Sequence, residues 1–134
     1  MNIYYDSEKE NWYTASTGNY FFGSSNNPLS TANPHPNHIA FPIVKNGKKI
    51  GPLIGIMVAR NKQNKLIGNS ALFMGLLKQL QQYSGGIIII FPPDNLQKDQ
   101  LTGYIFCSTR NKWIKAITPL PNIVYNRVPF RKTE

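Results

Sequence analysis

The side chains best suited to bind a ligand lie in the loop 60–69, between an apolar run and a predicted helix. Arg60 and Lys62 are cationic, and Asn69 stands where the helix is expected to begin. Ligands of open α/β sheets bind at the carboxyl ends of strands, and a helix N-terminus attracts anions. The loop therefore predicts a site for a carboxylate or phosphate. It lacks the glycine patterns of a standard nucleotide cradle, and a solvated basic loop is the simpler alternative.

A second candidate position follows the last predicted strand, where Asn126 and Arg127 are neighbours. An arginine can hold a carboxylate through two parallel hydrogen bonds, so Arg127 could clamp a ligand. It could equally pair with Glu134 or with an acid of another domain. We favour the interdomain role, because the chain at this point leaves one domain for another.

Histidine and cysteine give no support for metal or nucleophilic chemistry. His35 and His38 are three positions apart, but no Cys, Asp or Glu near them in sequence supplies a third ligand. The flanking prolines favour an extended loop, so the two imidazoles need not converge. Cys107 lies in a predicted strand without a nearby histidine, which is typical of a buried thiol. We predict no catalytic residue and no metal site in this chain.

The positive charge is concentrated in one part of the chain. Residues 1–50 carry four lysines and three acids, whereas residues 51–134 carry eleven basic residues and three acids, within a total of +9. Such a balance favours anionic partners, although it also serves solubility. Half of the sixteen aromatic residues lie in the nearly neutral segment. A nucleic-acid surface needs aromatic and basic residues interleaved, so nucleic-acid binding is the weakest of the functions considered.

The chain is expected to be cytoplasmic. Cys107 is the single cysteine, which excludes an intrachain disulfide and favours a reducing compartment. The N-terminus lacks the basic start and apolar stretch of a secretory signal. The longest apolar run, Ile87–Phe91, is far shorter than the roughly 20 residues of a membrane helix.

Aromatic and β-branched runs predict a small β element in residues 1–50, with Asn46-Gly47 as a hairpin turn. Its strands are expected at 3–5, 12–15, 20–22 and 39–44, and the Asn-, Pro- and Ser-rich stretch 24–38 reads as loop. We expect the aromatic side chains to pack this element onto the remainder of the domain.

Residues 51–134 predict an α/β arrangement. A strand at 53–59, an amphipathic helix beginning at Asn69 or Ser70, and a fully buried strand at Ile87–Phe91 would form a right-handed βαβ unit. A hairpin is expected from strands at 101–107 and 112–118. A further strand is expected at 123–125.

An ordered series of short motifs resembles the start of the YheC/YheD-type endospore coat-associated proteins, an ATP-grasp-like family of spore-forming bacilli. The resemblance covers nearly the whole chain. The motifs are Tyr20-Phe21-Phe22-Gly23, Phe41-Pro42-Ile43-Val44, Ile50-Gly51-Pro52-Leu53-Ile54-Gly55-Ile56, Gly103-Tyr104, Trp113, Pro119-Leu120-Pro121 and Ile123-Val124-Tyr125-Asn126-Arg127-Val128-Pro129.

The resemblance implies a domain organisation. Residues 1–50 would be an aromatic-rich β segment, and residues 51–134 a pre-ATP-grasp-like α/β domain. The nucleotide-binding lobes of the family, with lysines for ATP and acids for Mg²⁺, would follow Glu134 and are expected to be absent from this chain. The implied partners are that downstream ATP-grasp domain and spore coat proteins, and the implied location is the spore coat. No membrane partner is expected. A coat-scaffolding module is the alternative function.

Overall fold

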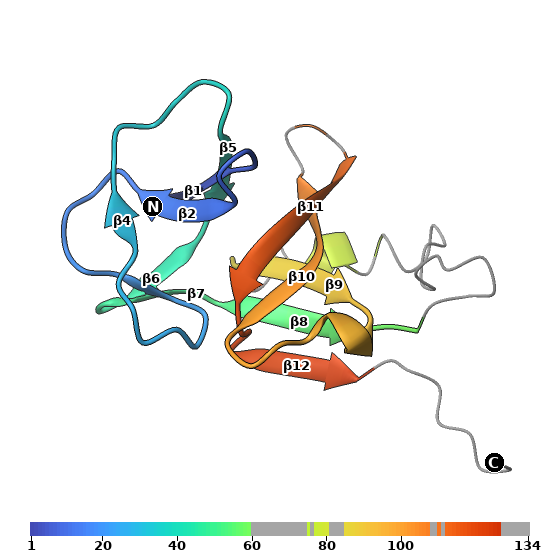
Figure 1. Ribbon diagram of the computed structural model, residues 1–134. Coiled ribbons are helices and arrows are strands. Elements are labelled where there is room, and N and C mark those ends of the chain that lie inside the picture. Colours follow the sequence, from blue (N-terminus) through green and yellow to red (C-terminus); the bar gives the residue numbers. More distant parts are fainter. Residues whose placement is uncertain (60–74, 76, 81–84, 108–109, 111, 127–134) are drawn as a thin grey trace, which may run out of the picture.

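The computed structural model describes residues 1–59, 75, 77–80, 85–107, 110 and 112–126 (Figure 1). The N-terminal residues form two small sheets. The first, called the N-terminal sheet, has the order β4-β2-β1-β5, and the second has the order β3-β7-β6. Their strands are β1 (Asn2–Asp6), β2 (Asn11–Thr14), β3 (Phe21–Phe22), β4 (Ser30–Thr31), β5 (Ile39–Pro42), β6 (Val44–Asn46) and β7 (Lys49–Gly51).

The remaining strands form the central sheet, with the order β11-β10-β9-β8-β12. They are β8 (Leu53–Met57), β9 (Ile87–Phe91), β10 (Gln100–Cys107), β11 (Lys112–Pro119) and β12 (Ile123–Asn126), and a 3-10 turn, η1 (Pro93–Asn95), precedes β10. Strands β9, β8 and β12 are parallel, whereas β10 runs antiparallel to β9 and to β11. The sheet is therefore mixed, and the predicted hairpin at 101–107 and 112–118 is confirmed as β10 and β11.

Strand β9 is covered on both faces, as its uninterrupted apolar sequence predicts. All of Ile87–Phe91 is buried between β8 and β10. Alternate side chains of a strand point to opposite faces. Ile87, Ile89 and Phe91 accordingly join one core cluster, and Ile88 and Ile90 join the other.

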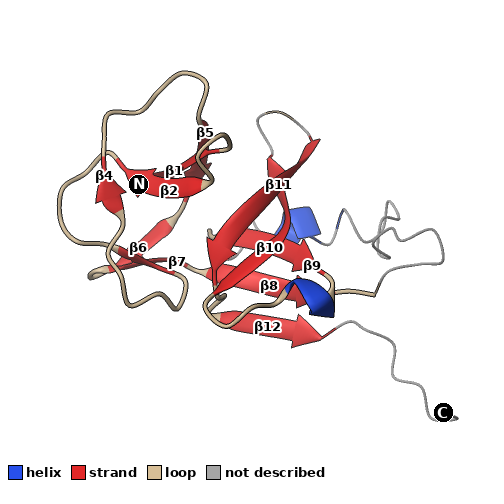
Figure 2. Cartoon of the chain, in the orientation of Figure 1, coloured by secondary structure: helices blue, strands red, loops and turns tan. Residues whose placement is uncertain are grey.

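Helix occurs between β8 and β9, but most of the expected element falls outside the described residues. Residues 75 and 77–80 are helical, and buried Leu77 packs with Ile54 and Ile88 on one face of the central sheet. Strand predominates in the described chain, as Figure 2 shows. The α/β class predicted from the sequence therefore holds only loosely. The handedness of the βαβ unit and the pre-ATP-grasp fold remain predictions.

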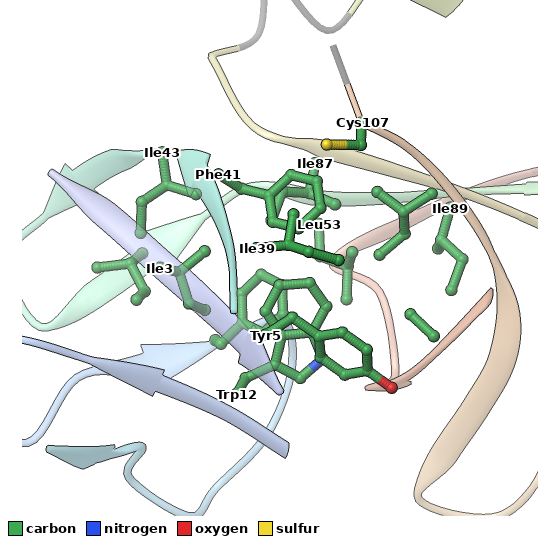
Figure 3. Close-up of a cluster of buried hydrophobic side chains, with 14 of the residues drawn as sticks. Ile3, Tyr5, Trp12, Ile39, Phe41, Ile43, Leu53, Ile87, Ile89 and Cys107 are labelled. Carbon is green, nitrogen blue, oxygen red and sulfur yellow. The ribbon is translucent and has the colours of Figure 1, made fainter. Parts of the chain in front are cut away.

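The opposite face of the central sheet packs against the N-terminal sheet. Figure 3 shows Tyr5 and Trp12 beside Leu53 and Ile87 in one continuous core. Trp12 lies 4.6 Å from Tyr5 and 5.1 Å from Phe22, measured between ring centroids. The predicted role of these aromatic side chains, to pack the β element onto the remainder of the chain, is confirmed. The proposed division into domains at residue 50 remains a prediction.

Two details of the N-terminal segment differ from the sequence prediction. The expected strand 39–44 is interrupted at Ile43, whose side chain is buried, so that β5 and β6 belong to different sheets. The expected loop 24–38 contains the short strand β4, because Ser30 and Thr31 pair with the edge of β2. Neither pairing could be read from local patterns, since both depend on where a distant strand lies. The Asn46-Gly47 turn is confirmed, and Gly47 has φ +64°.

Candidate functional site

The carboxyl ends of the parallel strands lie together where the strand order of the central sheet reverses. Strand β8 comes first in the chain, β9 pairs with one side of it, and β12 pairs with the other. Met57 is in register with Phe91 on β9 and with Asn126 on β12. In open sheets with parallel strands, ligands bind outside the carboxyl ends at such a reversal. This edge, called the switch edge below, is the candidate site.

The residues predicted to bind a ligand come from the two chain segments that leave this edge. Asn126 is the last residue of β12 and is exposed. Arg60 and Lys62 follow β8, and Arg127 follows β12, but all three lie outside the described residues, as does Asn69. The register confirms that β8 and β12 end side by side. The binding roles of the individual residues remain predictions.

Asn122 fixes β12 beside β8. Its backbone N–H donates to the carbonyl of Leu53 (2.8 Å), and its Oδ1 accepts from the N–H of the same residue (2.9 Å). Its Nδ2 donates to the carbonyl of Gly23 (2.9 Å), which also ties β3 to this junction. One amide side chain thus connects the sheet β3-β7-β6 to the central sheet. Sequence reasoning missed this role of Asn122, because its partners Leu53 and Gly23 are far away along the chain.

A glycine allows the turn before β12 to lie against the central sheet. A Cβ atom at Gly55 would lie 2.8 Å from Cγ of Pro121 and 2.9 Å from Cε1 of Phe91. Carbon atoms do not approach so closely without displacement, so a larger residue would push Pro121 outward. The side chain of Pro121 is buried. The position of β12, and hence the geometry of the switch edge, depends on this contact.

The histidines lie in a hydrogen-bonded chain that holds the loop before β5 against the N-terminal sheet. The hydroxyl of Tyr13 lies 2.6 Å from Nδ1 of His38, and Nε2 of His38 lies 3.4 Å from Oδ2 of Asp6. The backbone N–H of His35 donates to the Tyr13 hydroxyl (3.3 Å). The partners Asp6 and Tyr13 were missed in the sequence because they are more than twenty positions away.

The carboxyl group of Asp6 is held in its charged form. Burial acts to raise its pKa, but hydrogen bonds from the N–H groups of Lys9 and Glu8, with the charges of His38 and Lys9, outweigh that effect and lower the pKa. Across the described part of the chain, no three His, Cys, Asp or Glu side chains are placed to hold a metal ion. The contacts of Asp6, Tyr13 and His38 hold the loop before β5.

Cys107 lies at the end of β10 with 1% of its surface exposed and belongs to the core shared with the N-terminal sheet (Figure 3). Its predicted role as a buried core thiol is confirmed. In the described residues, no helix is long and apolar enough to cross a membrane.

The structure thus defines a β-rich domain with a mixed central sheet, whose parallel strands end at a switch edge. Over 87 residues the chain is 34% identical to the endospore coat-associated protein YheD of Bacillus subtilis (strain 168). This similarity supports assignment of the matched region to the YheC/YheD-type family. It covers 63% of this chain and 19% of that protein, so the chain spans about a fifth of the relative's length. No family model matches the chain, and no solved structure matches it.

Proposed function

We propose that this chain acts as an accessory, pre-ATP-grasp-like domain of a spore-coat-associated protein and does not catalyse a reaction alone. Its role is to contribute to a substrate pocket at the switch edge and to pack against a further domain. The observation that carries the proposal is the reversal of strand order, which brings the ends of β8 and β12 side by side. The similarity to YheD supports a role related to the spore coat.

The exposure of β12 supports the packing role. Ile123, Val124 and Tyr125 are 49%, 44% and 53% exposed, and β12 is an edge strand of the central sheet. Its partner β8 is almost wholly buried. Parallel strands are typically covered on both faces, because their crossover connections bring helices onto the sheet. An uncovered parallel strand with three large apolar side chains is therefore well suited to be covered by another part of the protein.

One face of β12 continues an apolar face of the central sheet. Residues paired across adjacent strands share a face, so Ile123 and Tyr125 extend the face that contains Ile54 and Ile56. That face is covered by Leu77 over β8 and β9. A second covering element beside the helical segment would bury Ile123 and Tyr125. We assign this position to the downstream domain.

The proposal places the binding of ATP and Mg²⁺ in that downstream domain. Calorimetric titration of Mg-ATP into the chain 1–134 at moderate salt should give no saturable heat, whereas a longer form of the parent protein should bind. Saturable binding to residues 1–134 would contradict the assignment of an accessory role. In that case, Arg60→Ser and Arg127→Ser would show whether nucleotide occupies the switch edge.

The two alternative functions, coat scaffolding and nucleic-acid binding, both require exposed aromatic side chains in the N-terminal segment. A coat-scaffolding module that docked a partner through Tyr20, Phe21 and Phe22 would need these side chains exposed, but Tyr20 and Phe22 are buried and Phe21 is half-buried. Three consecutive exposed apolar side chains, Ile123, Val124 and Tyr125, lie on β12 instead. For single-stranded nucleic acid, aromatic side chains must be free to stack on bases. Trp12, like Tyr20 and Phe22, is in the core and unavailable for stacking.

A further inference from the structure

A groove runs around the loop Gly23–Asn27, away from the switch edge. It consists of three hollows with volumes of about 490, 330 and 520 Å³. Ser25 lines all three hollows, so they adjoin one another around this loop. The opposite wall comes from the segment before β10, at Lys98 and Asp99, and from the turn between β1 and β2, at Glu10.

The loop that forms the common wall is held in one conformation. The backbone N–H and the hydroxyl of Ser24 both donate to the carbonyl of Leu120, at 2.9 and 3.0 Å. Gly23 has φ +63°, and a Cβ atom there would lie 2.6 Å from the same carbonyl. The N–H of Asn27 donates to the hydroxyl of Ser25 (3.1 Å). A wall fixed in this way loses little conformational entropy when a ligand binds.

The polar side chains along the groove have hydrogen-bonding capacity to spare. Within the described chain, the side-chain amides of Asn26 and Asn27 have no hydrogen-bond partner, and Lys98 and Asp99 form no ion pair. Each amide can donate two hydrogen bonds and accept others, so it can pair with both the C=O and the N–H groups of a peptide backbone. The groove thus offers both donors and acceptors along its length.

The charge of the groove changes sign from one end to the other. Lys49 lines the first hollow, Lys98 and Asp99 together line the second, and Glu10 and Asp99 line the third. In a chain with a net charge of +9, two of the six acids therefore gather at one end of the same groove. Complementary charge fixes the direction in which a ligand binds more than it adds affinity.

We propose that this groove binds an extended peptide with an acidic group at one end and a basic group at the other. The acidic group lies toward Lys49, and the basic group lies toward Glu10 and Asp99. The amides of Asn26 and Asn27 hydrogen-bond to the peptide backbone between the two ends. The site is separate from the switch edge, and the inference does not depend on the proposed function.

The test is an NMR titration of the ¹⁵N-labelled chain 1–134 with a pool of blocked hexapeptides that begin with Asp, end with Lys and vary between. The expected result is saturable shifts in the backbone amides of Ser24, Ser25, Asn26 and Asn27. A matched pool with Asn and Gln at the two ends should bind more weakly. A tetramer of N-acetylglucosamine is the third probe and tests whether the groove binds a sugar in place of a peptide.

Two variants locate the ligand, and a third is the control. Lys49→Ser and Glu10→Gln should each weaken binding of the Asp/Lys pool by roughly two- to fivefold, the size of an exposed ion pair. Lys112→Ser, an exposed residue at the start of β11, should leave it unchanged. Absence of shifts at the loop, equal binding of both pools, or shifts produced only by the sugar would overturn the proposal.

Discussion

The indole Nε1 of Trp12 donates a 2.8 Å hydrogen bond to the carbonyl oxygen of Ile117, 105 positions later in the chain. Ile117 lies on β11, at an edge of the central sheet, and its N–H donates to the hydroxyl of Tyr5 (3.2 Å). Open strand edges present unpaired backbone groups that favour aggregation. Two aromatic side chains of the N-terminal sheet therefore satisfy both backbone groups of Ile117 and join the two sheets.

Replacement of Trp12 by Phe should destabilise the chain. The carbonyl of Ile117 would lose its partner at a half-buried position, which lowers the free energy of unfolding by about 1–3 kcal/mol, and the smaller ring would add a packing loss. Urea denaturation monitored by circular dichroism measures the change. Tyr104→Phe, at an exposed position of β10, is the control and should stay within about 0.5 kcal/mol of the wild type. Equal stability of both variants would refute the edge role of Trp12.

Tyr5→Phe should change how stability depends on alkaline pH. Burial raises the pKa of Tyr5 above 10.0, against the opposing hydrogen bond from Ile117, and the charges of Glu10 and Asp6 raise it further. Because the pKa of Tyr5 is higher in the folded state than in the unfolded state, the contribution of Tyr5 to the free energy of unfolding is fully present below pH 10. This contribution is lost as pH rises from there through the folded-state pKa. Urea unfolding between pH 8 and 11 should show a shallower decline in Tyr5→Phe than in the wild type. Parallel curves would contradict this account.

Asp6→Asn should reduce the loss of folding stability at acidic pH. The folded-state pKa of Asp6 lies below the ordinary value of 3.8, so its contribution is present above that value and is lost as pH falls through the folded pKa. Asparagine can still accept hydrogen bonds from the N–H groups of Glu8 and Lys9, which isolates the effect of charge. The wild type should be more stable at pH 6, and the two proteins should converge toward pH 2. Asp99→Asn, at an exposed site, serves as the matched control.

Tyr125→Ser should leave the isolated chain almost as stable as the wild type. The residue is 53% exposed, so the free energy of unfolding should change by less than about 0.5 kcal/mol. Ile54→Ala, in the buried strand beside it, should cost about 2–5 kcal/mol.

With the proposed downstream domain supplied as a separate chain, the same Tyr125→Ser change should weaken the association of that domain with residues 1–134. Calorimetric titration of one piece into the other measures this association. Unchanged binding would argue that β12 is not the packing surface. A large loss of stability in the isolated chain would show instead that Tyr125 already packs within it.

Local sequence patterns predicted the elements of the central sheet. The run Ile87–Phe91 lacks polar residues because both faces of β9 are covered, and the polar turn between two β-rich runs marks the hairpin of β10 and β11. Asn46-Gly47 specifies a turn through the backbone freedom of glycine at positive φ. The similarity to YheD supports, over the matched region, the family resemblance that the ordered motifs indicated. These features depend on residues near one another in the chain.

Only the tertiary structure decided which distant groups meet. The parallel pairing of β12 with β8, the contact of Asp6 with His38, and the hydrogen bond from Trp12 to Ile117 each join segments whose separation leaves no local signal. A buried polar group must find a partner, but its own sequence neighbourhood does not say which one. The sequence by itself determined the strands and turns through local sterics and burial patterns. Strand order, the switch edge and the peptide groove follow from how those strands pack.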